Sequence, residues 1–309
     1  MNYLISGATG YIGSCLTKKL AKQGHHIHAL THITQPTFFH KNIQYIQTDI
    51  TEKKNLLHLT DTYDAVFHCA AKVNDYGVQK QFVAINIQAT KNLAETINTN
   101  CFVYLGHIRY EKHQNVGYYS QTKHQAEHFL LQKHNNENYP VIIIRPGNVF
   151  GPNASLWVLR LIQSIQNNTI RLIDNGKGIF HHTYIDNLLD AILLAINNPN
   201  AKGQTFDITD GDDSITWKKY LDDLAQIIEK PPIQKNISKT TAATLSKIMM
   251  IYSYLTKKPP LLSPTAVSIL TNTSKISIQK AQTILGYKPQ ISYETAMQNI
   301  KQWFNQQKK

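Results

Sequence analysis

The sequence predicts an α/β fold in which a doubly wound parallel sheet is covered by helices on both faces. Short, almost wholly apolar runs alternate with longer helix-like runs through the first half of the chain. Strands buried on both faces have this composition, and their alternation with helices is typical of parallel sheets. A glycine-rich turn also lies between the first apolar run and the first helical run, as in the doubly wound folds.

The elements follow from these patterns in chain order. Strands are expected at Tyr3–Ser6, Ile27–Thr31, Ile43–Gln47, Ala65–Cys69, Phe102–Leu105 and Val141–Ile144, and helices at Ile12–Gln23, Gln79–Asn98 and Ser120–Lys133. Gly24 stands where the first helix should end. In the less regular second half, Leu156–Gln166, Leu188–Ile196 and Trp217–Ile228 have helical patterns, Phe206–Thr209 is extended, and prolines interrupt the rest.

The first turn has the spacing Gly7-x-x-Gly10-x-x-Gly13, with Thr9, Tyr11 and Ile12 between the glycines. Glycines let the backbone approach a pyrophosphate, which then binds the amide groups at a helix N-terminus. This pattern after a first strand predicts a Rossmann-type dinucleotide-binding domain over residues 1–165, to which residues 180–200 return. Residues 166–309 are expected to form a smaller, mostly helical substrate-binding portion.

Composition and charge exclude several classes of protein. The hydrophobic content of 42% and charged content of 17% are those of a globular protein. The net charge is +12, but the lysines are spread along the chain without a basic stripe interleaved with aromatic residues, so we expect no nucleic-acid partner. The three cysteines and scattered histidines show no metal spacing, so no metal site is expected. Without a signal peptide or an apolar stretch long enough to span a bilayer, a cytoplasmic location is expected.

Tyr119 and Lys123 carry the chemistry that the sequence predicts. They are four residues apart at the start of an expected helix, so both side chains lie on one face. An ammonium group beside a phenol favours the phenolate. Tyr119 is therefore a candidate proton donor to a ketone or proton acceptor from an alcohol. The pair follows the fifth expected strand, at the carboxyl edge of the sheet.

Several further motifs occur in the same order as in one known family. They are Asp49-Ile50 after the third strand, the fourth-strand segment 66–73, Asn86 in the next helix, Tyr119-Ser120-Gln121-Thr122-Lys123, the loop 145–152 and the segment 184–188. With the glycine turn, they make the chain resemble, nearly end to end, the extended short-chain dehydrogenase/reductase family of the NAD(P)-dependent epimerase/dehydratase type. Segments 66–77 and 203–211 are most similar to the 3β-hydroxysteroid dehydrogenase-like branch, with dihydroflavonol reductase-like enzymes close to it.

The resemblance implies hydride transfer between NAD(P) and a hydroxyl or keto group of a substrate. In this family Lys123 would also bind the nicotinamide ribose, and Asn86 would either fix the backbone beside the active-site helix or touch the coenzyme region. The coenzyme-binding residues implied by the resemblance are Gly7, Thr9, Gly10, Tyr11, Ile12, Gly13, Thr31, His32, Asp49, Ile50, Cys69, Ala70, Ala71, Lys72, Asn86, Tyr119, Lys123, Pro146, Gly147, Asn148 and Val149.

One position departs from the family pattern. The fifth strand should lead into a Ser/Thr pair whose second member polarises the substrate carbonyl, but Gly106 and His107 stand there. The stretch from His107 to Tyr119 is also short for the family. An imidazole N–H of His107 would be able to replace the missing hydroxyl; alternatively, His107 faces solvent or a backbone carbonyl and the site is impaired.

The end of the second strand bears on the choice of coenzyme. NAD-preferring proteins usually carry an acid there that binds the ribose hydroxyls, whereas this chain has Thr31-His32. Without an acid to repel a 2′-phosphate, NADP(H) is favoured over NAD(H).

The sequence thus favours an NAD(P)-dependent oxidoreductase that acts on a hydroxyl/ketone pair of a small or moderately apolar substrate, such as a sterol-like, lipid-like or flavonoid-like molecule. A nucleotide-sugar epimerase of the same family and a weakly catalytic NAD(P)-binding sensor or assembly protein remain as alternatives. Residues 239–258 have the pattern of a basic amphipathic helix, which either contacts a membrane from the periphery, covers an apolar substrate, or packs as an ordinary surface helix. A homodimer is an expectation from the resemblance.

Overall fold

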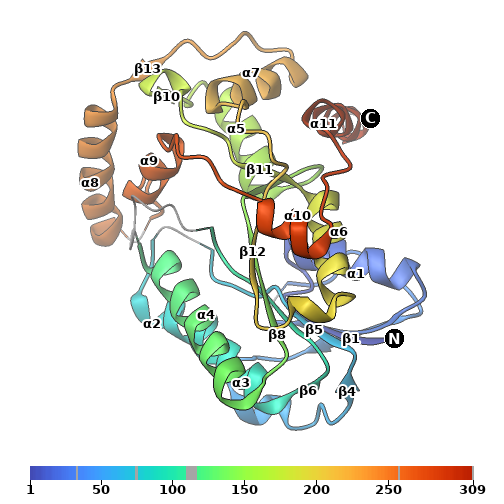
Figure 1. Cartoon of the computed structure of the whole chain (residues 1–309). Coiled ribbons are helices and arrows are strands. Elements are labelled where there is room, and N and C mark those ends of the chain that lie inside the picture. The colour runs from blue at the N-terminus through green and yellow to red at the C-terminus, as the bar shows by residue number, and fades with distance from the viewer. Residues whose placement is uncertain (33, 74–75, 109–116, 257, 308–309) are drawn as a thin grey trace.

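The computed structural model describes residues 1–32, 34–73, 76–108, 117–256 and 258–307. Within these ranges the central sheet has seven strands in the order β12-β8-β7-β5-β1-β2-β3, and all neighbours pair in parallel (Figure 1). The strands are β1 (Asn2–Ser6), β2 (His26–Thr31), β3 (Ile43–Gln47), β5 (Ala65–His68), β7 (Phe102–Leu105), β8 (Val141–Pro146) and β12 (Thr205–Ile208). The order reverses between β1 and β5, which confirms the predicted doubly wound, Rossmann-type α/β fold.

Alternate residues of the strands enter two separate hydrophobic cores, one on each face of the sheet. Ile5 and Phe67 pack on the side of α1 (Tyr11–Lys22) and α6 (Ile185–Ile196). Leu4 and Val66, their neighbours along the chain, pack on the opposite side. The helices there are α3 (Ala89–Thr96) and α4 (Gly117–Glu137), as Figure 1 shows. The apolar strand runs that suggested a sheet buried on both faces follow from this packing.

The helix expected at Gln79–Asn98 is divided in the structure. It consists of α2 (Gln79–Phe82), a π-helical segment η2 (Val83–Gln88) and α3, which ends at Thr96. Ile97 has an extended backbone, and Asn98–Thr99 forms a short strand β6 that pairs with β4 (Thr62–Tyr63). The expectation was wrong at this end because pairing with β4 stops the helix two residues earlier.

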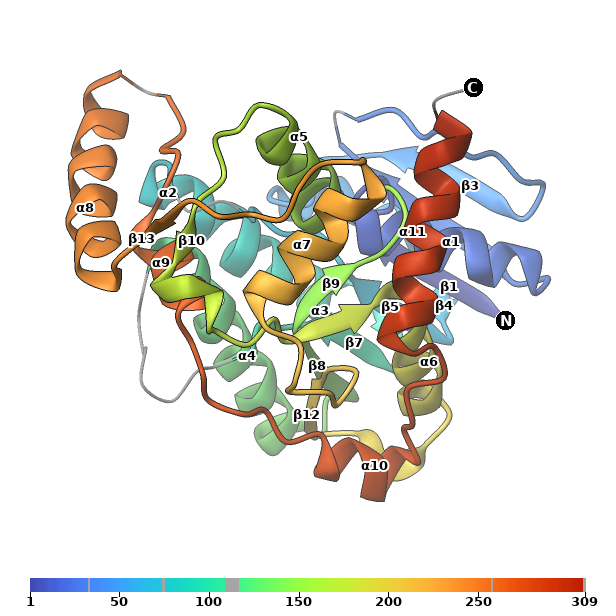
Figure 2. The same ribbon diagram turned by 90° about the horizontal axis from the view of Figure 1, so that it is seen from above.

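The remaining described elements lie mostly in the second half of the chain. They are η1 (Lys53–Leu56) in the first half, and β9 (Asn148–Phe150), η3 (Ser155–Leu159), α5 (Arg160–Gln166), β10 (Leu172–Ile173), η4 (Asp174–Gly176), β11 (His182–Tyr184), η5 (Pro199–Ala201), α7 (Trp217–Ile227), β13 (Asn236–Ile237), α8 (Lys239–Thr256), α9 (Pro264–Leu270), α10 (Gln279–Leu285) and α11 (Tyr293–Gln307). Figure 2 shows α5, α7 and α11 above the sheet and α8 at one side. The division at residue 165 stays a prediction, and β12 is a further segment after it that lies in the central sheet.

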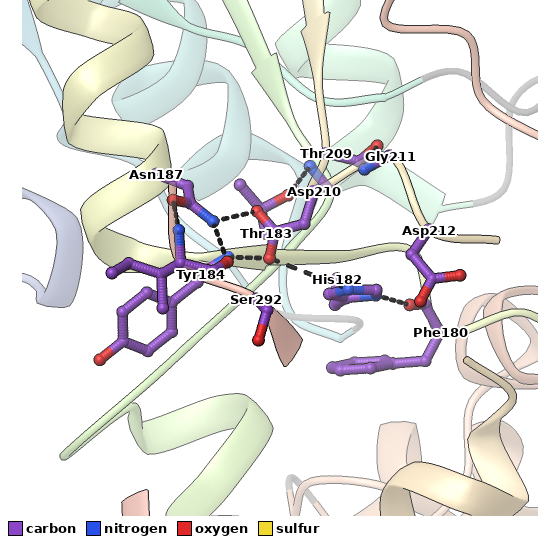
Figure 3. A network of polar contacts seen from close by, with 12 residues as sticks. Phe180, His182, Thr183, Tyr184, Asn187, Thr209, Asp210, Gly211, Asp212 and Ser292 are labelled. Carbon is purple, nitrogen blue, oxygen red and sulfur yellow. Dashed lines mark hydrogen bonds and ion pairs between the residues drawn. The ribbon is translucent and has the colours of Figure 1, made fainter. Parts of the chain in front are cut away.

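A buried asparagine ties the C-terminal segment to the rest of the molecule. Asn187, in the first turn of α6, donates to Asp210 Oδ1 at 2.9 Å, as Figure 3 shows. Asn187 also donates to the Ile291 carbonyl at 2.9 Å, and its Oδ1 accepts the backbone N–H groups of Gln290 and Ile291. Asp210 also accepts the N–H of Tyr184 at 2.8 Å, and burial raises the pKa of its carboxyl to about 7.

No helix in the described part of the chain is both long and apolar enough to cross a bilayer.

Candidate active site

The predicted site residues gather at the carboxyl edge of the central sheet. The turn 7–13 follows β1, His32 follows β2, the segment 69–72 follows β5, His107 follows β7, and Gly147 follows β8. Backbone hydrogen bonds join neighbouring segments at this edge, including Ala8 N to Leu30 O at 3.3 Å and Gly147 N to Ile208 O at 2.9 Å. The sheet thus brings residues from five parts of the sequence to one edge, where doubly wound folds bind ligands.

The glycine turn has the geometry that a pyrophosphate needs. Gly7 has φ +68°, and a Cβ on it would lie 2.6 Å from the Ala70 backbone nitrogen. A Cβ on Gly13 would lie 2.2 Å from the Gly7 oxygen, so α1 starts as close to the turn as backbone allows. No side chain caps the N-terminus of α1 at Gly10, and its first turn contains no acid. The amide groups there are therefore free of a competing carboxylate, and the residues fit the phosphates of a dinucleotide.

Asn86 fixes the loop after β5. It is buried in η2; its Oδ1 accepts the Lys72 N–H at 2.8 Å, and its Nδ2 donates to the Lys72 carbonyl at 3.4 Å. Its Nδ2 also donates to Thr122 Oγ1 on α4 at 3.0 Å. Asn86 thus links the loop that contains Cys69–Lys72 to the helix that carries Tyr119 and Lys123. This is the first of the two roles considered for it, and a contact with coenzyme stays a prediction.

Tyr119 and His107 lie next to each other. Their ring centroids are 5.2 Å apart, with the ring planes at 62°. Tyr119 sits in the first turn of α4, and His107 follows the end of β7. Burial, together with the charges of Lys123 and Arg145, lowers the pKa of His107 to about 4. A neutral imidazole beside the tyrosine can offer one N–H to an oxygen at this edge. Residues 109–116 of the short stretch between the two lie outside the described residues.

Lys123 is buried one helical turn beyond Tyr119. Its Nζ lies 4.0 Å from the centroid of the Tyr104 ring, and Tyr104 in turn donates its hydroxyl to the Lys123 carbonyl at 3.2 Å. Burial lowers the pKa of the Lys123 ammonium to about 7, while Cys69 and Glu127 act in the opposite direction. A cation near an aromatic face is attracted by its π electrons. The sequence did not point to Tyr104, because a tyrosine in a buried strand has the pattern of any core residue.

A buried ion pair explains the glycine at position 106. A Cβ on Gly106 would lie 3.0 Å from Arg145 Cγ and 3.3 Å from Glu127 Oε2. Arg145 forms a bidentate pair with Glu127, with Nε 2.9 Å from Oε2, and its Nη1 lies 3.7 Å from Asp207 Oδ1. A serine side chain at position 106 would therefore be in tight contact with the Arg145 stem, which would have to shift. The sequence motifs included Arg145 and Glu127, but they did not reveal that the two side chains pair next to Gly106.

An open depression of about 590 Å³ lies at the other end of the same sheet edge. It is lined by His32, Gln47, Thr48, Asp49, Lys54, Asn55 and His58. His32 Nε2 lies 3.9 Å from Asp49 Oδ2, and Asp49 accepts the backbone and hydroxyl hydrogens of Thr51 at 2.9 and 2.7 Å, which holds the pKa of its carboxyl below its usual value. Lys54 and His58 were not among the predicted coenzyme-binding residues. The signal that could have indicated them was two basic side chains four residues apart, shortly after Asp49-Ile50.

The described residues contain no group of three or more His, Cys, Asp or Glu side chains able to hold a metal ion.

The buried histidine His68 is part of the scaffold. Its Nδ1 lies 2.6 Å from Ser6 Oγ and its Nε2 2.9 Å from Thr90 Oγ1, and burial lowers its pKa to about 3. Because the Thr90 hydroxyl donates to the Asn86 carbonyl, His68 donates from Nε2 and accepts at Nδ1.

The family of the chain follows from its similarity to known proteins. A model of the NAD dependent epimerase/dehydratase family matches residues 3–209. The chain belongs to this family. The resemblance to the extended short-chain dehydrogenases/reductases is thereby confirmed, and the matched range contains every predicted coenzyme-binding and catalytic residue. The replacement of the family's Ser/Thr pair by Gly106 and His107 stays a prediction from the sequence.

Characterised relatives are similar over nearly the whole chain. A 2-alkyl-3-oxoalkanoate reductase of Stenotrophomonas maltophilia is 25% identical, covering 97% of this chain and 98% of its own. A sterol-4-alpha-carboxylate 3-dehydrogenase of Candida albicans is 25% identical, covering 98% and 97%. A 3-beta-hydroxysteroid dehydrogenase of Mycolicibacterium neoaurum is 24% identical, covering 95% and 88%. These proteins are oxidoreductases by name.

Solved structures share the fold. An epimerase from Methanothermobacter thermautotrophicus aligns with a TM-score of 0.78 at 19% identity, covering 99% of this chain and 92% of its own. The UDP-glucuronic acid 4-epimerase of Bacillus cereus, solved with UDP-glucuronic acid and NAD, aligns with a TM-score of 0.75 at 22% identity, covering 99% and 100%. The whole chain, including the elements after residue 209, therefore follows the architecture of these proteins.

Proposed function

We propose that this protein is an NAD(P)-dependent oxidoreductase that interconverts a hydroxyl and a keto group on a small or moderately apolar, sterol-like or lipid-like substrate. The contact between the His107 and Tyr119 rings, one helical turn from buried Lys123, carries the proposal. The relatives named as a 3-oxoalkanoate reductase and as sterol dehydrogenases support the substrate class.

Each of the three side chains has one task in this reaction. The coenzyme, when bound, supplies or accepts the hydride. Tyr119 gives its phenolic proton to the carbonyl oxygen in reduction and takes the hydroxyl proton in oxidation. Lys123, when protonated, stabilises the phenolate and binds the nicotinamide ribose. His107, which is neutral at pH 7, donates a second hydrogen bond to the same substrate oxygen in place of the usual hydroxyl.

The role of Tyr119 as the proton donor is tested by replacing Tyr119 and its neighbour Tyr118 in separate variants. Tyr119→Phe should lower kcat by roughly 10²- to 10⁴-fold, the usual contribution of one general acid, and leave coenzyme affinity unchanged. Tyr118→Phe is the matched control, because the Tyr118 ring packs near Phe82 at 5.9 Å rather than against His107. Coenzyme oxidation is followed by absorbance with 3-ketosterols and 2-alkyl-3-oxoalkanoates. Full activity of Tyr119→Phe would refute this role.

The role of His107 is tested with two substitutions. His107→Ala should lower kcat because the substrate oxygen loses one hydrogen-bond donor, and His107→Ser should recover part of the loss because it restores the hydroxyl that the family usually has. Equal activity of all three proteins would exclude a role for His107 in catalysis.

We also propose that NADP(H) is preferred over NAD(H). The end of β2 carries Thr31 and His32 instead of an acid, and Lys54 and His58 line the same depression as His32. These basic groups can bind a 2′-phosphate, whereas Asp49 is engaged by Thr51. Lys54→Ala should weaken NADPH binding about tenfold, as expected for one charge-assisted hydrogen bond, and leave NADH binding unchanged. Lys53→Ala is the control, since Lys53 pairs with Glu95 at 2.9 Å.

A nucleotide-sugar epimerase is the second candidate. Epimerases of this family would use the same tyrosine and lysine, here Tyr119 and Lys123, and the UDP-glucuronic acid 4-epimerase shares the fold. Thermal unfolding with and without UDP-sugars separates the two: a rise in Tm with a UDP-sugar and none with a ketosteroid favours the epimerase. Tight coenzyme binding without turnover of either class of substrate would instead support a sensor.

The proposal also includes a homodimer, which sedimentation velocity would measure, and a peripheral membrane contact through residues 239–258.

A further inference from the structure

Helix α8 (Lys239–Thr256) has its large apolar side chains on the outside. The residues that it buries are small: Ala242, Ser246 and Ser253. The helix contacts α9 (Pro264–Leu270), where Ala242 packs with Val267 and with Ile173 of β10. A surface helix normally buries its large apolar residues and exposes polar ones. In α8 this distribution is reversed.

The outer face of α8 is formed by Ile248, Ile251, Tyr252 and Leu255, which recur at intervals of three and four residues. Leu255 is 79% exposed, and Leu261, shortly after the helix, is 84% exposed. Figures 1 and 2 show α8 at the edge of the molecule with one side turned away from the other elements. A contiguous exposed apolar face on a soluble fold marks a surface that contacts another apolar phase or partner.

The charge around this face identifies the partner. Lys239, Lys247 and Lys258 are exposed on or next to α8. The sequence contains no Asp or Glu between Glu229 and Glu294. Exposed apolar and tyrosine side chains that are accompanied by lysines, in a segment without acidic residues, match an anionic lipid surface, where the apolar groups enter the acyl boundary and the ammonium groups meet the phosphates. A second copy of the chain would place these lysines against each other.

We propose that the outer face of α8 docks the protein on membranes that contain anionic phospholipids. The inference deepens the proposed function by assigning the membrane contact to one helix face and one lipid class. The position of the helix is suited to an apolar substrate. It packs on α9, whose Thr265 Oγ1 would lie 3.0 Å from a Cβ on Gly117, the first residue of the helix that carries Tyr119.

The experiment measures co-sedimentation of the full chain with vesicles. The wild type should bind vesicles of phosphatidylcholine and phosphatidylglycerol in equal amounts, bind weakly to phosphatidylcholine alone, and dissociate as salt is raised. Ile251→Ser combined with Leu255→Ser should weaken binding about tenfold or more, because less apolar surface enters the membrane. Both side chains are exposed, so Tm should stay unchanged. Leu57→Ser is the control, as Leu57 lies outside α8 and is about as exposed as Ile251.

Three outcomes would overturn the proposal. They are absence of vesicle binding, binding that the double variant leaves intact, and a wild-type dimer in size exclusion that the double variant converts to a monomer without any vesicle binding. The last would assign the face to a second copy. Turnover of a water-soluble ketone by the double variant reports on the chemistry independently, and Tyr119→Phe should still bind vesicles. The docking surface and the oxidoreductase activity can therefore fail separately.

Discussion

Asn86 holds both backbone polar groups of Lys72, accepting the N–H at 2.8 Å and donating to the carbonyl at 3.4 Å. The same amide donates to Thr122 Oγ1 on the active-site helix. The loop after β5 and the first turns of α4 are therefore positioned by one buried side chain. The π-helical segment η2 places Asn86 there, and such segments are frequent at functional sites.

Asn86→Ala is expected to lower the free energy of unfolding by about 1 kcal/mol or more, because it leaves the part-buried backbone groups of Lys72 without this partner. Coenzyme affinity should fall as well, since the loop loses its fixed position. Thr122→Val keeps both contacts of Asn86 with Lys72 and removes its contact with α4, together with the hydroxyl's own hydrogen bonds to the helix carbonyls. Its effect on coenzyme affinity should therefore be smaller, and its effect on stability should not be additive with that of Asn86→Ala. Urea denaturation and fluorescence titration with coenzyme measure both effects. Strict additivity would show that the two residues act independently.

Gly7→Ala and Gly24→Ala separate backbone strain from close approach. Both glycines have positive φ, +68° and +87°, so each alanine should cost about 1–2 kcal/mol for the left-handed conformation. A Cβ at Gly24 meets nothing within 4 Å, whereas at Gly7 it would lie 2.6 Å from Ala70 N. Gly7→Ala should therefore destabilise the protein more and weaken coenzyme binding, and Gly24→Ala should leave binding unchanged. Equal losses of stability in thermal melts would contradict the close approach.

The sheet and the candidate residues of the site were predictable because their signals are local. The apolar strands, the glycine turn and the Tyr119–Lys123 spacing all lie within short segments. The contacts that complete the site join residues far apart in sequence. The Arg145 side chain lies against Gly106 only because β8 lies beside β7, and Lys123 meets Tyr104 because α4 covers that strand. The amphipathic pattern of residues 239–258 likewise did not reveal which face packs inward, because that depends on the small residues that meet α9.

Asn187→Ala should loosen the C-terminal segment. Asn187 makes four hydrogen bonds, to Asp210, Gln290 and both polar groups of Ile291. Its removal leaves part-buried groups of Asp210 and Ile291 without this partner, at a total cost of about 1–3 kcal/mol. Hydrogen exchange should speed up over residues 287–307 more than in the central strands. Asn197→Ala is a control, because the Asn197 amide contacts only the end of its own helix at Leu193. Uniform exchange changes across the chain would argue against a local tie.

The buried ammonium of Lys123 should make the stability of the protein without coenzyme depend on pH. Burial lowers its pKa from 10.5 to about 7 in the folded chain, so between these values the unfolded chain binds more protons. Stability should then rise as pH increases from about 7 toward 10, and below pH 7 the full cost of the buried charge is present. Each tenfold change in proton affinity corresponds to about 1.4 kcal/mol. Lys123→Met should flatten this rise and stabilise the protein at pH 7, while the exposed Lys230→Met should change neither. Urea denaturation across this pH range decides the matter: a wild-type stability that stays level or falls between pH 7 and 10 would mean that Lys123 keeps its proton in the folded chain.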